Sequence, residues 1–555
     1  MSEENELVFA ALGGLGEIGM NCALYGFGPA RRRKWLMVDL GVAFAGDDLP
    51  GVDLILPDIA FIEKAKRDLV GIVITHAHED HIGALIDLWP RLGPPVYATR
   101  FAAGLLEARR LSEPGAPDIP IEVVDQGARV AVGPFDVEFI PVAHSIPESC
   151  ALAIRTPAGL IVHTGDWKID ATPLVGLPTD EARFTALGEE GVLALVCDST
   201  NVLREGESPS EADVAKSLAA LVATAKGRVL VTAFASNVAR LRAAAEAGFA
   251  NGRQVLVMGR AMERVIAVAR ECGYLNGVPA FLGMDHFDRL PRDKVLALAT
   301  GSQGEPRAAM ARIAEDEHPA ASLAPGDMAI FSSRAIPGNE KAVSKIVNGL
   351  VAQGVEVVTD RTNLVHVSGH PRRAELARLY AWARPKIAVP AHGEALHLAE
   401  HAAFAKTQGV ANVVKARDGE IVLLDVERAG IVGEIETGRL YKDGEIVLPP
   451  GDDGIAQRRR LSFAGMVSIA IAVTGKGELA GDPDVLIAGL PERTQAGRGM
   501  DEIVDTTIFE TFDNMPRPKR RDPDVLSGAI ERAVRNAINA AWGKKPNVHV
   551  LIVEV

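Results

Sequence analysis

A chain of 555 residues is too long for one compact core, so its length predicts about three domains. Acidic residues outnumber basic ones by 73 to 59, and the net charge of −14 excludes a generally basic surface, so a nucleic-acid substrate would need a local basic groove or bound metal ions. The four cysteines form no C-x-x-C pair, which indicates neither a disulfide framework nor a thiolate zinc site. No apolar run reaches the roughly 18 residues of a membrane span, and the acidic start lacks the features of a signal peptide, which predicts a cytoplasmic protein without membrane contact.

The first apolar segments flank a glycine-rich turn, G-G-L-G-E-I-G, which begins at Gly13. Such a loop could bind phosphate, but no convincing helix follows it, so a tight loop near a site is the alternative to a dinucleotide fingerprint. The next strand, residues 35–38, ends in Asp39. An acid at the end of an apolar run is either exposed or hydrogen-bonded, and we expect Asp39 to orient a ligand histidine.

The segment T-H-A-H-E-D-H-I, residues 75–82, follows an apolar run that predicts a buried strand and precedes the predicted start of a helix. Its histidines and aspartate offer imidazole nitrogens and a carboxylate, which suit zinc or a similar divalent ion. His76 and His78 can turn toward one metal, and Asp80 and His81 toward another. Four ligands would crowd one tetrahedral ion, so the spacing predicts two metals. A solvated polar loop is the alternative.

Four later apolar runs also deliver a metal-binding residue type at or just past the end of the predicted strand. These residues are His144, Asp166, Asp198 and His392. In layered α/β folds the carboxyl edge of the sheet is where sites are built. With the segment before His76, five runs therefore predict convergence on a single crevice.

Between Pro209 and about Asn363 helices and short strands alternate, which predicts a parallel α/β domain inserted into the chain. We expect helices at 211–225 and 238–250. Polar turns after its strands could hold phosphate oxygens, although ordinary turns use the same residues. The candidates are Ser236, Asn237, Arg260, Ser332, Ser333 and Arg334.

The segment H-V-S-G-H-P, residues 366–371, places histidines and a serine around a glycine turn, which packing alone explains poorly. We therefore predict a functional loop, followed by a helix at 373–383. Its candidate residues are His366, Ser368, Gly369 and His370. Most other histidines, such as His163 and His401, lack comparable neighbours and are predicted to be structural or surface groups.

After about Leu448 the charged stretch P-P-G-D-D-G-I-A-Q-R-R-R predicts a loop-like linker over residues 448–463. Beyond it, strands and two helices, at 501–512 and 524–542, predict a small α/β domain over residues 464–555. Its basic run at 517–521 could contact RNA or another subunit, or could be solvated.

The ordered set Asp39, H-A-H-E-D-H, His144 and Asp166 is similar to the successive motifs of the metallo-β-lactamase fold. Asp198, the inserted α/β domain, S-G-H ending at His370 and V-P-A-H-G-E around His392 resemble the β-CASP nucleases. Within that group, H-V-S-G-H with a C-terminal α/β domain resembles the bacterial ribonuclease J family. The resemblance implies an α/β metallo-β-lactamase αββα sandwich in two parts, an inserted β-CASP domain and a small C-terminal domain. The expected ranges are 1–208 and 364–447 for the sandwich, 209–363 for the β-CASP domain and 464–555 for the C-terminal domain.

The resemblance also implies two Zn²⁺ per subunit, with Mn²⁺ or Mg²⁺ as ions that could also support activity. One zinc would be held by His76, His78 and His144, the second by Asp80, His81 and His392, with Asp166 bridging them. Asp39 would orient a ligand, and Asp198 would fix the imidazole of His392. The residues with expected catalytic roles are Asp80, Asp198 and His370. His366, Ser368 and the Ser332–Ser333 turn would bind the RNA backbone or a 5′ phosphate.

The implied activity is that of a zinc-dependent ribonuclease, a 5′ to 3′ exonuclease that prefers 5′-monophosphate ends and is also an endonuclease, in RNA maturation, including rRNA processing, and mRNA decay. His370 could protonate the departing 3′ oxygen as a general acid. The alternatives are a β-CASP nuclease acting on DNA, a thioester or lactone hydrolase with the same H-x-H-x-D-H core, and a non-catalytic RNA-binding scaffold. The expected partners are single-stranded RNA, copies of the chain in a homodimer or homotetramer, and components of an RNA-decay complex.

Overall fold

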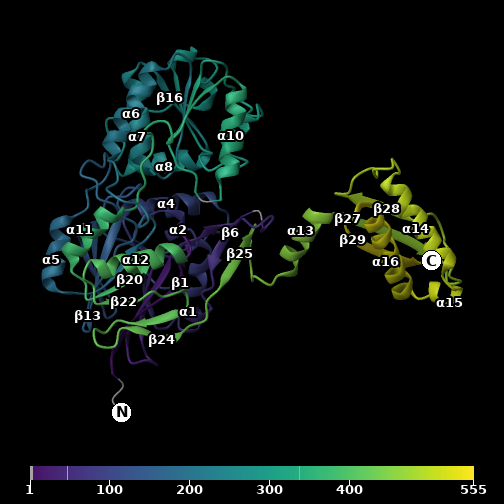
Figure 1. Ribbon diagram of the computed structural model, residues 1–555, viewed down its shortest axis with the longest axis horizontal. Helices are drawn as coiled ribbons and strands as arrows, with labels where there is room; N and C mark the ends of the chain where they lie inside the picture. Colours follow the sequence, from purple (N-terminus) through teal and green to yellow (C-terminus); the bar gives the residue numbers. More distant parts are fainter. Residues whose placement is uncertain (1–3, 47, 337) are drawn as a thin grey trace. The chain divides into compact units, whose positions relative to one another are not determined.

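The computed structural model describes residues 4–46, 48–336 and 338–555. The chain divides into two compact units (Figure 1). The first unit runs to Ala43 and then comprises Ile55–Leu440, and the second comprises Phe44–Leu54 and Tyr441–Val555. In the described ranges, no helix is both long and apolar enough to cross a membrane.

Two β-sheets pack face to face in the first unit. The eight-stranded sheet has the order β24-β23-β1-β3-β4-β7-β8-β9 and the seven-stranded sheet the order β10-β11-β12-β13-β14-β20-β22. One cluster of buried residues joins them, with Phe9 and Val73 from the first sheet and Phe139, Leu152 and Val389 from the second. The strands of the first sheet are β1 (Glu6–Gly13), β3 (Cys22–Gly28), β4 (Lys34–Val38), β7 (Leu69–Val73), β8 (Val96–Ala98), β9 (Ile121–Val123), β23 (Glu420–Leu423) and β24 (Gly430–Glu434). Those of the second are β10 (Arg129–Val132), β11 (Phe135–Pro141), β12 (Cys150–Thr156), β13 (Gly159–His163), β14 (Val192–Asp198), β20 (Ile387–Ala391) and β22 (Asn412–Val413).

Helices α5 (Glu181–Glu190), α11 (Arg373–Ala383) and α12 (Ala395–Thr407) pack on the outer side of the second sheet, where Phe184, Leu376 and Ala405 join a second buried cluster. The helices associated with the first sheet are α1 (Ala60–Lys64), α2 (Glu79–Ile82), α3 (Leu85–Leu92) and α4 (Arg100–Ser112). Short strands β2 (Leu15–Gly16), β5 (Ala43–Phe44), β6 (Leu54–Pro57) and β21 (Gly393–Glu394) lie between the longer elements along the chain. The predicted αββα sandwich is confirmed.

The inserted domain has a five-stranded sheet of order β16-β17-β15-β18-β19, in which every pair is parallel. The predicted helices are present, although the first ends at Thr224 instead of Ala225. Ser210 and Asp213 form a capping box that begins the first helix. The elements are α6 (Glu211–Thr224), β15 (Val229–Thr232), α7 (Val238–Ala250), β16 (Gln254–Met258), α8 (Arg260–Glu271), η1 (Met284–His286), η2 (Arg292–Lys294), β17 (Val295–Ala299), α9 (Ala309–Ala314), β18 (Met328–Phe331), α10 (Glu340–Ala352) and β19 (Glu356–Val358).

Helix α8 of the inserted domain lies beside α4 of the sandwich (Figure 1). A Cβ atom on Gly104 of α4 would lie 2.7 Å from Val268 Cγ1 of α8, so the two helices approach closely. Glu148 connects the domains at this point, because it accepts hydrogen bonds of 2.7 Å from the Phe101 amide and from the Tyr274 hydroxyl. The Phe101 and Tyr274 rings also pack edge to face, 6.0 Å apart.

The second unit contains a three-stranded sheet of order β28-β27-β29, which α14 and α16 cover through one buried cluster. The predicted linker at 448–463 is wrong in its local structure, because most of it forms helix α13 (Asp453–Ala464). Asp452 caps this helix by accepting a 2.8 Å hydrogen bond from the Gly454 amide, and Ile455 is buried. The remaining elements are β25 (Arg439–Asp443), β26 (Ile446–Leu448), β27 (Met466–Val473), β28 (Asp484–Ala488), α14 (Met500–Asn514), α15 (Arg517–Arg520), α16 (Pro523–Trp542) and β29 (Asn547–Glu554).

Candidate metal centre

The predicted convergence of strand ends is present in the first unit. In the parallel pair β4 and β7, Val38 lies opposite Val73, which brings Asp39 beside the turn that holds the first ligands. In the parallel pair β14 and β20, Asp198 lies opposite Ala391, the residue before His392. Sheet register therefore brings together side chains that are far apart in the sequence.

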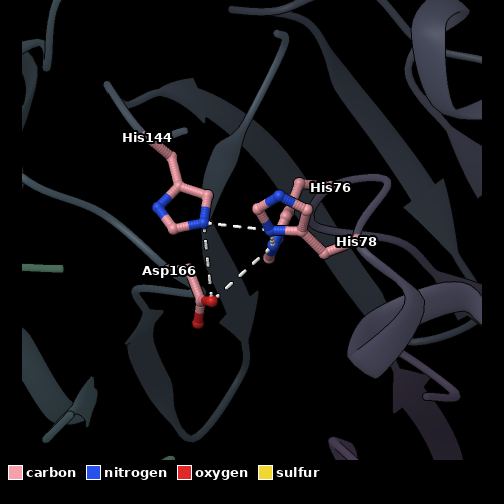
Figure 2. A group of neighbouring side chains, drawn as sticks. All are labelled: His76, His78, His144 and Asp166. Atoms are coloured by element: carbon pink, nitrogen blue, oxygen red, sulfur yellow. Dashed lines mark hydrogen bonds and ion pairs between the residues drawn. The ribbon is translucent and has the colours of Figure 1, made fainter. Parts of the chain in front are cut away.

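The first ligand group consists of His76, His78, His144 and Asp166, whose ligand atoms all lie within 4.8 Å of one another (Figure 2). His78 Nδ1 lies 3.1 Å from both His76 Nε2 and His144 Nε2. Asp166 Oδ2 lies 3.7 Å from His76 Nε2 and 3.6 Å from His144 Nε2. Three imidazole nitrogens and one carboxylate oxygen are a donor set that suits a divalent cation such as zinc.

The second group consists of Asp80, His81, Asp166 and His392, again within 4.8 Å. Asp166 Oδ2 lies 3.4 Å from His81 Nε2, so the same oxygen faces both groups. Asp80 Oδ2 lies 3.6 Å from both His81 Nε2 and His392 Nε2. His392 Nε2 is buried and lacks a hydrogen-bond partner within the described ranges, as expected for an atom that binds a cation. The residues of both groups therefore fit a pair of divalent ions that share Asp166.

The charge state of the first group is that of metal ligands. Burial lowers the pKa of His76 and His144 well below the ordinary value and lowers that of His78 to about 4. These imidazoles are therefore neutral at pH 7, the form in which histidine coordinates a metal. In the second group burial opposes protonation, but Asp166 and neighbouring carboxylates raise the pKa of His81 and bring that of His392 to about 10. A bound cation would take the place of those protons, because ligands must be deprotonated.

Asp39 is buried and makes the contacts predicted for a residue that orients a ligand. Its Oδ2 accepts a 2.7 Å hydrogen bond from His81 Nδ1, which directs His81 Nε2 toward Asp80 and Asp166. Its two oxygens also accept 2.8 Å hydrogen bonds from the amide and hydroxyl of Thr75. Asp39 has a left-handed φ of 62°, a strained conformation that these three bonds hold in place.

Asp198 has a different partner from the one predicted. His370 Nδ1 donates a 2.7 Å hydrogen bond to Asp198 Oδ2, whereas His392 Nδ1 lies 3.9 Å from Asp198 Oδ1 and donates instead to Asp166 Oδ1 at 2.7 Å. The reason is that Asp198 Oδ1 accepts from the Thr200 amide at 2.8 Å, which turns the carboxylate toward the loop of His370. Although burial opposes it, Asp198 and Asp166 raise the pKa of His370 above its ordinary value.

The segments of the chain match four family descriptions. They are the metallo-beta-lactamase superfamily at residues 19–229, the ribonuclease J beta-CASP domain at 226–350, the Zn-dependent metallo-hydrolase RNA specificity domain at 354–415 and the ribonuclease J C-terminal domain at 454–555. A ribonuclease J from Sinorhizobium meliloti is 53% identical over 555 residues, which cover 100% of this chain and 98% of the relative. The chain belongs to the ribonuclease J family.

Two further ribonuclease J relatives share a smaller fraction of identical residues with this chain. The protein from Corynebacterium glutamicum is 40% identical, with 99% of this chain and 76% of the relative covered. The protein from Mycolicibacterium smegmatis is 38% identical, with 98% and 97% covered. A solved structure of a protein of unknown function from Enterococcus faecalis aligns with 75% of this chain and 100% of its own, at a TM-score of 0.53 and 16% identity, which indicates a shared fold.

In this member of the ribonuclease J family, the H-V-S-G-H loop contacts one of the candidate metal ligands. His144 Nδ1 donates a 2.7 Å hydrogen bond to the Gly369 carbonyl, which directs His144 Nε2 toward Asp166. A Cβ atom on Gly369 would lie 2.5 Å from His144 Cε1, so only glycine fits. Ser368 Oγ accepts a 2.8 Å hydrogen bond from Asn201 Nδ2.

Sequence reasoning missed two amides at the site. Asn201 Nδ2 also donates to the His370 carbonyl at 3.1 Å, and Asn21 Nδ2 lies 3.0 Å from His81 Nε2 and 3.2 Å from the Asp80 carbonyl. Asn21 lies at the end of the glycine-rich turn, which parallel pairing of Leu15 with Gly393 holds beside His392. The sequence feature that could have indicated Asn201 is its position shortly after the predicted site residue Asp198.

The predicted phosphate-binding residues divide into two sets. Ser332 and Ser333 are buried near the H-V-S-G-H loop: Ser332 Oγ donates to the Val365 carbonyl at 2.6 Å, and Ser333 Oγ to the Ser302 carbonyl at 3.4 Å. Asn237 instead caps α7, because its Oδ1 accepts from the Arg240 amide at 2.9 Å. The half-buried Ser236 directly precedes this cap, and the exposed Arg260 begins α8; no side-chain contact in the described ranges links either one to the loop.

His366 differs from these residues because its Nδ1 is buried and has no hydrogen-bond partner in the described part of the chain. Burial, followed by the charges of Arg240 and Arg334, lowers its pKa well below the ordinary value. Two histidines predicted to be structural or surface groups contact hydroxyls: Nδ1 of the half-buried His163 lies 2.8 Å from the Tyr25 hydroxyl, and Nδ1 of the buried His401 lies 2.8 Å from Ser199 Oγ.

Proposed function

We propose that this chain is a zinc-dependent ribonuclease that degrades RNA from 5′-monophosphate ends in the 5′ to 3′ direction and also cleaves RNA internally. The observation that carries the proposal is the pair of ligand groups that share Asp166 Oδ2, beside a His370 whose pKa is raised. Membership of the ribonuclease J family supports RNA as the substrate.

His76, His78 and His144 would hold one zinc ion, Asp80, His81 and His392 the second, and Asp166 both. When bound, the ions would supply Lewis acidity that polarises the phosphate group and activates water. The residues around them keep the ligand atoms oriented: Asp39 directs His81 through its Nδ1, and the Gly369 carbonyl directs His144 in the same way.

His370 is the proposed general acid. Its Nδ1 donates to Asp198, so the proton on Nε2 is the one available for the departing 3′ oxygen. Asp198 favours the protonated imidazole, because its negative charge stabilises the positive ring. The cleaved strand would then carry a 5′ phosphate and present it for the next cycle.

The 5′ monophosphate would bind near His366, Ser368 and the Ser332–Ser333 turn, with Arg334 adding positive charge. The unpartnered Nδ1 of His366 supports this location. A 5′ triphosphate carries more charge and bulk, so it should bind less well in a pocket built for one phosphate group.

End-labelled RNA tests the proposal directly. With zinc present, 5′-monophosphate RNA should yield mononucleotides from its 5′ end, and a chelator should stop the reaction. Matched 5′-hydroxyl and 5′-triphosphate RNAs should react more slowly. Equal rates on all three would remove the 5′ pocket, and no cleavage of RNA by the metal-loaded protein would refute the proposed function. A DNA oligonucleotide of the same sequence tests the alternative substrate.

We also propose that the C-terminal domain mediates assembly into a homodimer or homotetramer. The sheet face opposite α14 and α16 exposes Leu486, Leu551 and Val553, at 63%, 65% and 46% of their surface. Apolar patches of this kind commonly mark protein interfaces. Light scattering on the full chain should give two or four times the chain mass of 58.9 kDa, and a monomeric mass would refute the assembly.

A further inference from the structure

Three arginines lie on segments that border the H-V-S-G-H loop, which Ser332, two residues before Arg334, contacts through the Val365 carbonyl. Arg334 lies on the turn after β18, and Arg372 follows His370 by two residues. Arg204 lies on the loop after β14, and its carbonyl oxygen accepts a 3.0 Å hydrogen bond from the Arg373 amide, which ties this loop to the start of α11. The β-CASP domain and the sandwich therefore both contribute positive charge beside the H-V-S-G-H loop.

The charges of these arginines act on one another. Burial, and after it the charges of Arg334 and Arg372, lower the pKa of the Arg204 guanidinium, while Asp360 opposes the change. Like charges repel, and an anion bound among these arginines would offset that repulsion. The net charge of −14 means that carboxylates to neutralise the cluster are abundant in this chain.

Carboxylates nevertheless leave two of the three arginines without a partner. Arg334 Nε donates to Asp360 Oδ2 at 3.1 Å. Across residues 4–46, 48–336 and 338–555, the side chains of Arg204 and Arg372 make neither a hydrogen bond nor an ion pair, and Arg372 Nε is a buried donor without an acceptor.

The nearest acidic residues in the sequence have other partners. Glu205 pairs with Arg373 at 3.2 Å, and Glu207 pairs with Arg378 at 3.7 Å. The guanidinium groups of Arg204 and Arg372 therefore remain available to an external anion.

We propose that Arg204 and Arg372, together with Arg334, bind phosphate groups of single-stranded RNA beside the metal centre. This inference rests on the proposed function and names residues that determine how that site holds its substrate. A guanidinium group presents parallel N–H donors that match two phosphate oxygens, and it stays charged at every working pH. The three arginines also supply the local positive charge that an acidic protein needs for a nucleic-acid substrate.

The test uses Arg204→Gln, Arg372→Gln and the double variant of the metal-loaded full chain, with steady-state kinetics on single-stranded RNA at several salt concentrations. Each substitution should raise KM about tenfold, as expected when one charged hydrogen bond is removed, with kcat nearly unchanged. The slope of log kcat/KM against log salt should become shallower by about 0.7 for each phosphate that the variant no longer neutralises.

Arg378→Gln is the matched control, because it removes the same charge from α11 but from an arginine that pairs with Glu181 at 3.1 Å. Its KM and salt slope should equal those of the unaltered chain. Arg204→Lys and Arg372→Lys should have the salt slope of the unaltered chain, since lysine keeps the charge. Their KM should lie between those of the unaltered chain and the Gln variants, since lysine lacks the paired donors. A melting curve for each variant separates a binding defect from unfolding.

Matched 5′-monophosphate and 5′-hydroxyl RNAs distinguish two sources of phosphate. If the arginines bind the terminal phosphate, the Gln variants lose the preference for the monophosphate end. If they bind the backbone, the KM of the Gln variants rises by the same factor for both RNAs. Gln variants that degrade RNA with unaltered KM and salt slope would overturn the inference while leaving the proposed function intact. Failure of the unaltered chain to cleave RNA would instead overturn the proposed function.

Discussion

Replacing His370 by alanine separates a general acid from a metal ligand. His370 Nδ1 lies 2.7 Å from Asp198 Oδ2 and 3.9 Å from Asp166 Oδ2, and neither of the two ligand groups described above needs it. His370→Ala should therefore leave two metal ions per chain. A positioned general acid contributes about 10²- to 10⁴-fold to the rate, so kcat should fall by that factor, which corresponds to about 3–5 kcal/mol in the activation free energy.

The assay combines metal analysis of the purified variant with kinetics on 5′-monophosphate RNA. His286→Ala is a matched control, because that side chain is 41% exposed and its polar contact among the described residues is Asp285, at 3.0 Å. This control should leave the metal content and kcat unchanged. The refuting result for His370→Ala is the loss of a metal ion. Asp166, Asp198, His370 and His392 also lie within 4.8 Å of one another, so metal loss would make His370 a ligand.

Three further predictions concern pH and packing. Asp198→Asn removes the negative charge that contributes most to raising the pKa of His370. Because the protonated ring is the active form, the basic limb of the pH–rate profile should move to lower pH. A basic limb that does not move would contradict this role. Gly369→Ala should displace His144 and weaken metal binding by about tenfold or more, measured by titration with a zinc chelator, since its Cβ would lie 2.5 Å from the imidazole. Burial raises the pKa of Asp418 to about 7, above its unfolded value, so this group destabilises the fold as pH rises from about 4 through 7. Asp418→Asn should therefore raise the melting temperature more at pH 8 than at pH 5, and an equal change at both would contradict the assignment.

The sequence alone determined the ligand types and the strand ends that deliver them. His76 and His78 lie in the short loop after the buried strand β7, and Asp80 and His81 lie in the helix α2 that follows, so local geometry brings them together. Apolar runs that end in or just before His144, Asp166 or His392 predicted the remaining candidate ligands, because parallel strands present their carboxyl ends at a common edge. Helix ends in the inserted domain were also predictable, since Ser210 and Asp213 cap α6 through local hydrogen bonds.

Only the tertiary structure decided which acid contacts which histidine. Asp166 and Asp198 follow neighbouring strands, and the choice between them for His392 and His370 depends on side-chain directions and on the Thr200 amide, which sequence patterns do not encode. The same reason explains why Arg204, Arg334 and Arg372 could not be recognised as a group. Residues from separate loops become neighbours through sheet register and domain packing, and those long-range contacts leave no local periodicity in the chain.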